Sequence, residues 1–215
     1  MLLDLSHTIE AGMTTYPGLP GPLVCDFISR EASRARYAPD VEFQIGRIEL
    51  VGNTGTYVDS PFHRYADGAD LTALPLSSLA DLETVVVRVA PETRAVERCA
   101  FEGVDVRGRA VLVHTGFARH WRTERYLSDN PFLTGEASAH LAHAGAALVG
   151  IDSVNIDDLG NLARPAHSVL LGAGIPICEH LTGLEQLPAR GARFFAVPPR
   201  VRAFGTFPVR AFAIA

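Results

Sequence analysis

The sequence contains no lysine, and all 19 of its cationic residues are arginine. Against them stand 24 acidic residues, which give a formal net charge of −5 at pH 7. No dense basic patch appears along the chain, so nucleic acid is not an expected partner. Cysteine is also scarce, because there are only three, widely spaced. This number excludes a disulfide framework and a cysteine-based zinc module.

Long apolar runs are missing as well. The longest, such as 144–149 and 169–177, fall well short of the ~20 residues that a membrane-spanning helix needs. The opening residues Met1 to Asp4 lack the basic start and the apolar stretch of a signal peptide. No glycine-rich phosphate loop of the dinucleotide or Walker type is present. We therefore expect a cytoplasmic globular protein that binds neither membranes nor nucleotides.

The composition is that of a folded globular domain: of the 215 residues, 47% are hydrophobic and 20% are charged. We expect one domain over residues 1–215. Alternating or β-branched runs predict five strands: 2–5, 43–50, 84–89, 110–114 and 147–151. Helical spacing predicts one clear helix over 135–145 and a short one over 77–82, and the apolar C-terminus predicts a closing core strand. The fold class is α/β, rich in strands, with one βαβ crossover between 110 and 151.

The segment from Asn53 to His63 (NTGTYVDSPFH) carries the most chemistry. Its glycine, proline and β-branched residues argue against a helix. In an extended conformation, Asn53, Tyr57, Asp59 and His63 lie on one face. A carboxylate and an imidazole so placed suit a metal ligand beside a general acid/base. The alternative is structural: Asp59 caps the turn at Ser60-Pro61, and His63 is an ordinary surface histidine.

A second cluster follows far downstream, where His167 precedes Glu179. Glu179 comes directly after an apolar run, so it should lie at the buried end of a core strand. Buried glutamates need a partner, which is here either a metal ion or an arginine. Cys178 and His180 flank Glu179 and should point to other sides of that strand.

Several segments together resemble the cyclase family of metal-dependent hydrolases, whose members include bacterial kynurenine formamidases. Residues 4–9 and Tyr16-Pro17-Gly18 look like the family's opening strand and aromatic turn. The central stretch is similar to the signature His-x-Gly-Thr-His-x-Asp-x-Pro-x-His. Residues 115–117, 150–154, 167–179 and 207–211 fit the remaining landmarks in order.

The resemblance implies a fold, an assembly and a set of roles. The fold is a swivelling β/β/α domain with few helices, assembled as a homodimer or homotetramer. Asp59 corresponds to the bridging metal ligand, His167 and Glu179 to the distal ligands, and His63 to the acid/base. Tyr16 corresponds to an aromatic residue that lines the substrate pocket.

Two positions depart from the family signature, because Asn53 and Tyr57 stand where it has its leading histidines. An amide oxygen is a weak zinc ligand, and a phenol must lose its proton to bind well. We expect one divalent metal, zinc or manganese, held by Asp59, His167 and Glu179, or else a metal-free pocket. Asn53 then borders the substrate, and Tyr57 donates a hydrogen bond to a developing oxyanion.

The function that these residues imply is hydrolysis of a small amide or lactone, with an arylformamide as the family's usual substrate. Two alternatives stay open. One is a metal-independent cyclase or dehydratase acting on a polyketide-like or aromatic substrate. The other is a non-catalytic binding protein of the same fold.

Overall fold

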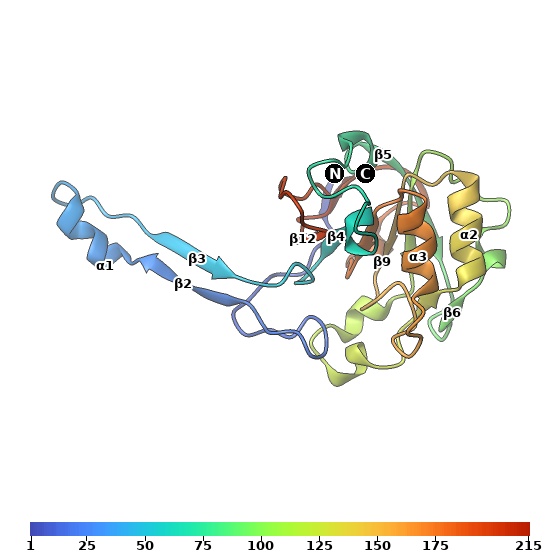
Figure 1. Cartoon of the computed structure of the whole chain (residues 1–215), viewed down its shortest axis with the longest axis horizontal. Coiled ribbons are helices and arrows are strands. Elements are labelled where there is room, and N and C mark those ends of the chain that lie inside the picture. The colour runs from blue at the N-terminus through green and yellow to red at the C-terminus, as the bar shows by residue number, and fades with distance from the viewer.

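A computed structural model describes residues 1–215. The chain forms a body and a long projecting arm (Figure 1). The body is built on a mixed sheet of nine strands in the order β1-β13-β11-β5-β7-β9-β10-β4-β12. The predicted strand-rich α/β fold with few helices is confirmed. The strands of the sheet are β1 Leu2–Asp4, β4 Tyr57–Asp59, β5 Leu82–Arg88, β7 Ala110–His114, β9 Leu148–Ile151, β10 Ile177–Glu179, β11 Arg190–Phe195, β12 Thr206–Pro208 and β13 Phe212–Ile214.

The centre of the sheet is parallel, because β5, β7, β9 and β10 run side by side in one direction. Their β-branched residues are buried on both faces, as is usual when a parallel sheet is covered on each side. Val85 and Val87 of β5 pack into one apolar core, and Val86 packs into the other. Each core holds 19 buried residues, so alternation along each strand supplies both sides of the sheet.

Two helices cover one face of the sheet, α2 (Gly135–Ala144) and α3 (Pro165–Gly172). Thr134 caps α2 through a bond from the backbone N–H of Ala137, and Gly145 ends it with a φ of +82°. A left-handed residue at this position favours glycine because it has no Cβ. The predicted helix over 135–145 and the βαβ crossover β7-α2-β9 are therefore both confirmed.

Some predicted elements have other bounds or another conformation. The helix expected over 77–82 is wrong: residues Leu76–Ser78 form only a 3₁₀ turn, and β5 begins at Leu82. The apolar run before Glu179 overlaps the second half of α3, a helix that the sequence pattern did not predict. Gly174, with a φ of +77°, follows that helix before β10 begins.

The chain ends close the sheet, as expected for the apolar C-terminus. Strand β13 lies between β1 and β11, and it pairs antiparallel with both. Strand β12 lies at the opposite edge, where it pairs antiparallel with β4. A separate two-stranded parallel sheet, β6 (Ala95–Val96) with β8 (Phe132–Leu133), completes the body.

The arm consists of residues 23–49 and extends well away from the body (Figure 1). Its antiparallel strands are β2 (Leu23–Ile28) and β3 (Ile45–Glu49), and the short helix α1 (Arg30–Ser33) lies near its tip. The strand predicted over 43–50 is confirmed as β3, but every residue of it is exposed. No helix of the chain combines the length and the apolar character needed to cross a membrane.

Candidate functional site

Three neighbouring short strands, β10, β4 and β12, form the floor of the site. Tyr57 lies beside Glu179 in the register of β4 with β10, and Asp59 lies beside Thr206 in the register of β4 with β12. Alternation along each strand directs these side chains to the face that the helices cover, as it does Ile177. Val58 and Cys178 lie between them in sequence and pack into the opposite core. Cys178 therefore points away from the site, as expected.

Helix α3 brings His167 over this floor. Its Nδ1 lies 2.7 Å from Oδ2 of Asp157, and the same carboxylate accepts the backbone N–H of His167 at Oδ2 and that of Ala166 at Oδ1. Asp157 is fully buried and ionised carboxylates only accept, so Nδ1 carries the proton and Nε2 points toward the floor. The Asp157 carboxylate thus fixes both the start of α3 and the orientation of the imidazole.

Nε2 of His167 lies 3.7 Å from Oδ2 of Asp59 and 3.6 Å from Oε1 of Glu179. Burial would lower the pKa of His167, but the charge of Glu179, the bond to Asp157 and the charge of Asp59 raise it to about 10. Burial would likewise raise the pKa of Asp59, but the charges of His63 and His167 and the Thr206 hydroxyl lower it overall. The Asp59 carboxylate is therefore an anion, and it lies beside the cationic imidazole of His167.

Both oxygens of Glu179 already have hydrogen-bond partners. The Tyr57 hydroxyl donates to Oε2 at 2.5 Å, and the backbone N–H of Ile156 donates to Oε1 at 2.5 Å. Burial raises the pKa of Glu179 to about 7, and burial together with the nearby carboxylates raises that of Tyr57 well above its ordinary value. The phenol therefore stays neutral, and its single proton is engaged by Glu179. Donation to a substrate oxyanion, as predicted for Tyr57, would require this bond to break.

His63 reaches the site from a 3₁₀ turn, Pro61–His63, that follows β4. Its Nδ1 lies 2.8 Å from the Thr206 hydroxyl, which also donates to Oδ1 of Asp59. A hydroxyl has one proton, so when that proton goes to Asp59 the Thr206 oxygen accepts from His63 Nδ1. Nδ1 of His63 is engaged by this bond, which leaves Nε2 as the ring nitrogen that can exchange a proton with a substrate.

Gly205 allows Thr206 to approach this closely. A Cβ on Gly205 would lie 2.6 Å from both the N and the Cα of His63, which is far inside van der Waals contact. The Gly205 carbonyl also accepts the backbone N–H of Ser60 at 2.7 Å. A side chain at this glycine would therefore push the His63 turn away from β12.

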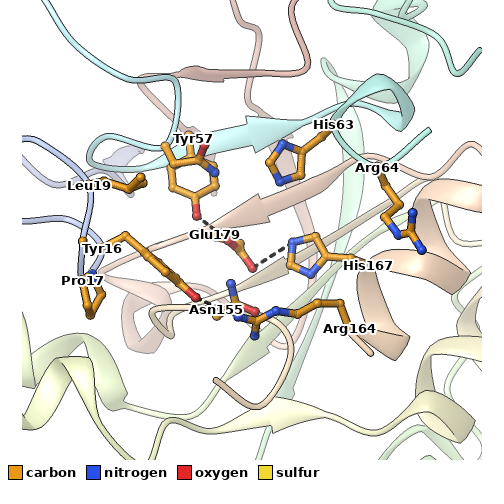
Figure 2. Close-up of a pocket in the computed structure, with 12 residues that line it drawn as sticks. Tyr16, Pro17, Leu19, Tyr57, His63, Arg64, Asn155, Arg164, His167 and Glu179 are labelled. Atoms are coloured by element: carbon orange, nitrogen blue, oxygen red, sulfur yellow. Dashed lines mark hydrogen bonds and ion pairs between the residues drawn. The ribbon is translucent and has the colours of Figure 1, made fainter. Parts of the chain in front are cut away.

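The residues surround a cavity of about 380 Å³. Asn53, Tyr57, His63, His167 and Glu179 line it, so segments more than one hundred residues apart converge as expected. Tyr16, Pro17 and Leu19 form a wall on the side of the cavity away from His63 and Arg64, and Arg164 and Asn155 lie next to Tyr16 (Figure 2). A cavity of this size suits a small planar ligand.

The path of residues 53–63 differs from the extended conformation expected for it. Only Tyr57–Asp59 is a strand, Gly55 has a φ of +65°, and a 3₁₀ turn carries His63. Three of the four predicted side chains line the cavity all the same, Tyr57 from the strand and Asn53 and His63 from the turns on either side. Asp59 is fully buried, and its Oδ1 lies 3.8 Å from Nδ1 of His63.

A candidate divalent-metal site lies at the cavity floor. Nitrogen or oxygen atoms of Asp59, His63 and His167 all lie within 4.8 Å of one another. Oδ2 of Asp59 is buried and has no hydrogen-bond partner, which suits a ligand waiting for a cation. The carboxylate of Asp59 and the imidazole of His167 are N/O donors that fit zinc or manganese, and His63 lies beside them. The structure places His63 rather than Glu179 in this compact group.

The family's other metal position does not fit a cation in this chain. Tyr57 stands there as a neutral phenol bonded to Glu179. Asn53, the second departure from the signature, offers only an amide, a weak ligand for zinc. Asp59 therefore has no second group of ligands with which it could bridge two ions.

Two residues of the site escaped the sequence analysis. Thr206 and Asp157 are common residue types, and neither stands in a motif that announces a role. Thr206 directly precedes the Phe207–Ala211 element, but no sequence pattern indicates a role for its hydroxyl. Asp157 lies five residues after Asp152, and only the packing of α3 onto the sheet brings it to His167.

Comparison with known proteins agrees with this fold. The family model described as "Putative cyclase" matches residues 3–158. The chain is 26% identical to the kynurenine formamidase of Geobacillus thermodenitrificans over 97% of this chain and 95% of that protein. It is 28% identical to the kynurenine formamidase of Salinibacter ruber over 98% and 95%. Its fold is similar to that of isatin hydrolase A from Labrenzia aggregata bound to benzyl benzoate. The TM-score is 0.82 at 21% identity, over 99% of this chain and 93% of that one.

The strand-rich α/β fold and the Asp/His/His cluster beside its pocket are those of a candidate hydrolase. The family model covers well over half of the chain. The chain belongs to the cyclase family.

Proposed function

We propose that the chain is a metal-dependent hydrolase of a small aromatic amide or lactone. The observation that carries the proposal is the cluster of the buried Asp59 with His63 and His167, the two histidines lining one small cavity. The cavity has Tyr16, Pro17 and Leu19 on its opposite wall, which suits a planar substrate. Relatives named kynurenine formamidase and a structural neighbour named isatin hydrolase support hydrolytic chemistry on aromatic compounds.

Asp59 and His167 would hold one zinc or manganese ion, with His63 and Glu179 beside it. When bound, such an ion supplies polarisation of a carbonyl and a water of lowered pKa. His167 is held ready by Asp157, and the ion would take the place of the proton that His167 otherwise shares with the two carboxylates. Metal binding at this site therefore releases a proton.

His63 moves the proton of the reaction. Its Nδ1 is held by Thr206, so Nε2 accepts a proton from water as that water attacks the substrate carbonyl. The carbon–oxygen bond forms, the carbon–nitrogen or ring carbon–oxygen bond breaks, and the same proton passes from His63 to the departing amine or alkoxide. The side chain of His63 is 34% exposed, so it meets both substrate and solvent.

The test is hydrolysis of N-formylkynurenine, isatin and a panel of aryl amides by the purified protein with added zinc or manganese. We expect His63→Ala to lose activity by about 100- to 10,000-fold while keeping its metal content. His143→Ala is the matched control, because His143 is exposed on α2. Full activity in His63→Ala would remove the proposed proton carrier. Loss of the metal in this variant would make His63 a ligand instead.

One observation favours a second candidate, a metal-independent cyclase or dehydratase. Between Asp59 and Glu179, a protonated His167 balances the buried carboxylates by itself. Tyr57, His63 and Glu179 would then move protons without an activated water. Enolisation or ring closure of an aromatic substrate, unchanged by chelators, would support this candidate over hydrolysis.

We also propose that the arm joins two copies of the chain. A two-stranded hairpin is marginally stable alone in water, and the arm exposes Phe27, Phe43 and Ile48 by 69%, 54% and 54%. Ion pairs such as Arg34–Glu42 and Arg47–Glu49 leave charges of both signs on it, which does not suit a polyanionic partner. Because most soluble assemblies are homo-oligomers, a second copy is the occupant that we propose.

A further inference from the structure

Arg164 directs its side chain into the cavity from the turn that begins α3. Its backbone φ is +47°, a left-handed conformation that is uncommon for a residue with a side chain and costs energy. The guanidinium lies beside Tyr16 and Asn155, across from His63 and Glu179 (Figure 2). The strained turn places a permanent positive charge inside a pocket whose other cationic groups are titratable or exposed.

The hydrogen bonds of Arg164 do not use all of its donors. One nitrogen donates to the Asp158 carbonyl at 3.0 Å and another to the Tyr16 hydroxyl at 2.9 Å. A guanidinium carries five N–H donors in a planar fork, so the rest of the fork is unbonded. No carboxylate forms an ion pair with it, whereas Arg94 at the neighbouring surface pairs with Asp158 at 2.7 Å.

The N-terminal turn of α3 offers no carboxylate that could pair with the Arg164 guanidinium. The first free N–H groups of that helix, on Ala166 and His167, already donate to the Asp157 carboxylate. Asp157 is in turn engaged by His167, so it is not available to Arg164. The guanidinium is thus fixed in position by two neutral oxygens, with its remaining donors and its charge left for a ligand.

We propose that Arg164 binds a carboxylate of the substrate, so that the site prefers aromatic amides carrying an ionised carboxyl group over neutral ones. The preference among amide substrates rests on the proposed hydrolase function. The binding of a carboxylate by Arg164 does not depend on that function. The planar fork matches a carboxylate through two parallel bonds. With the anion held at Arg164, the aromatic ring lies along Tyr16 and the scissile bond extends toward His63.

Arg64 is the competing anchor, since it also lines the cavity. Its Nε donates to the Ser168 hydroxyl at 3.3 Å, and its guanidinium lies over the Tyr65 ring at 5.1 Å. Arg64 is exposed, however, whereas Arg164 is half-buried. Water weakens a charge pair at the exposed position, so Arg164 is the stronger anchor.

The experiment compares formanilide with its carboxylated analogues, 2-, 3- and 4-formamidobenzoate, as substrates of the metal-loaded protein. We expect kcat/KM for at least one isomer to exceed that for formanilide by about 10- to 100-fold. Arg164→Gln should remove this preference by lowering only the value for the anion, and Arg164→Lys should retain part of it. Arg64→Gln and the distant, exposed Arg98→Gln should leave the preference within about 3-fold of wild type.

A structural role for Arg164 makes a different prediction. Tyr16→Phe removes the hydroxyl that accepts from Arg164 but keeps the guanidinium charge. If Arg164 binds the substrate carboxylate, this variant still prefers the anionic substrate. Equal loss of formanilide and formamidobenzoate turnover in Arg164→Gln would overturn the proposal in favour of a structural role. Loss of the preference in Arg64→Gln but not in Arg164→Gln would also overturn it.

Binding without turnover separates this inference from the proposed function. Calorimetric titration should show 2-, 3- or 4-aminobenzoate binding to wild type at least 10-fold more tightly than aniline, with the difference lost in Arg164→Gln. That result supports the anchor even when wild type hydrolyses no amide, which would refute only the hydrolase. Equal binding of aminobenzoates by wild type and by a folded Arg164→Gln variant would overturn the anchor, whatever the activity.

Discussion

The arm and the floor of the site are both made of paired antiparallel strands, but their surroundings are opposite. In β2 and β3 nearly every residue is exposed, whereas Tyr57, Val58 and Asp59 of β4 are all buried. The arm touches no core, so its contacts are local and replaceable. The floor holds carboxylates and an imidazole that depend on one another within a few ångströms. Equal changes in sequence should therefore have unequal effects in the two regions.

The largest effect should come from Gly205→Ala at the floor. The added Cβ would lie 2.6 Å from the His63 backbone, so β12 and the His63 turn must separate. We expect a loss of about 2 to 3 kcal/mol in the free energy of unfolding together with loss of activity. Denaturant unfolding and hydrolysis assays measure both.

Gly160→Ala is the matched control for that change. A Cβ on Gly160 meets nothing closer than 3.6 Å, so stability and activity should stay close to wild type. Equal behaviour of the two variants would contradict the close approach of Gly205 to His63.

A smaller effect is expected from Thr206→Val, which keeps the shape of the side chain and removes the hydroxyl. Asp59 and His63 then lose their shared partner, and kcat should fall by about 10- to 100-fold with little change in KM. Thr206→Ser restores the hydroxyl and should recover most of the activity. A Ser variant as weak as the Val variant would show that the methyl group, not the hydroxyl, matters.

The next effect concerns pH. Burial and the nearby His7 lower the pKa of His180 to about 3 from 6.5, and its Nδ1 lies 2.9 Å from the Tyr126 hydroxyl. Below pH 6.5 the unfolded chain binds a proton at this residue that the folded chain rejects. The free energy of unfolding should therefore fall between pH 6.5 and about 3, by up to about 1.4 kcal/mol per pH unit.

His180→Asn removes this titration, and asparagine tolerates the left-handed φ of +56° at that residue. Urea unfolding at several pH values should give a shallower acid dependence than wild type. His143→Asn on the exposed surface of α2 is the control, and it should leave the slope unchanged. An unaltered slope in His180→Asn would show that other groups cause the acid sensitivity.

The smallest effect on stability belongs to the arm. Phe27→Ser with Phe43→Ser should change the free energy of unfolding by about 0.5 kcal/mol or less per site, because both rings are largely exposed. The same double variant should sediment as a monomer where wild type sediments as a dimer. Equal assembly of wild type and variant would contradict the arm as the contact between copies.

The sequence predicted the body better than the arm. Residues 110–114 are almost all apolar, whereas 43–50 mix apolar with polar residues, and both become strands. A mixed pattern is typical of a strand with one buried face, and nothing local shows that every residue of β3 is exposed. Burial depends on the rest of the chain, so the length and position of the arm were not predictable.

The candidate site divides in the same way. Asp59, His63, His167 and Glu179 belong to residue types and spacings that indicate chemistry, and each lies 3.6 to 3.8 Å from another of the four. Thr206, Asp157 and Arg164 act through distances that arise only when β12 and α3 pack on the sheet. The bond of Tyr57 with Glu179 likewise depends on the register of β4 with β10.

We propose that Asp59 and His167 hold one divalent ion and that Tyr57 occupies the place of a second. Metal analysis by mass spectrometry, on protein purified without chelators and then supplied with zinc or manganese, tests it most directly. We expect one ion per chain in wild type and almost none in Asp59→Asn or His167→Ala. Two ions per chain, none in wild type, or the same content in wild type and both variants would contradict the account.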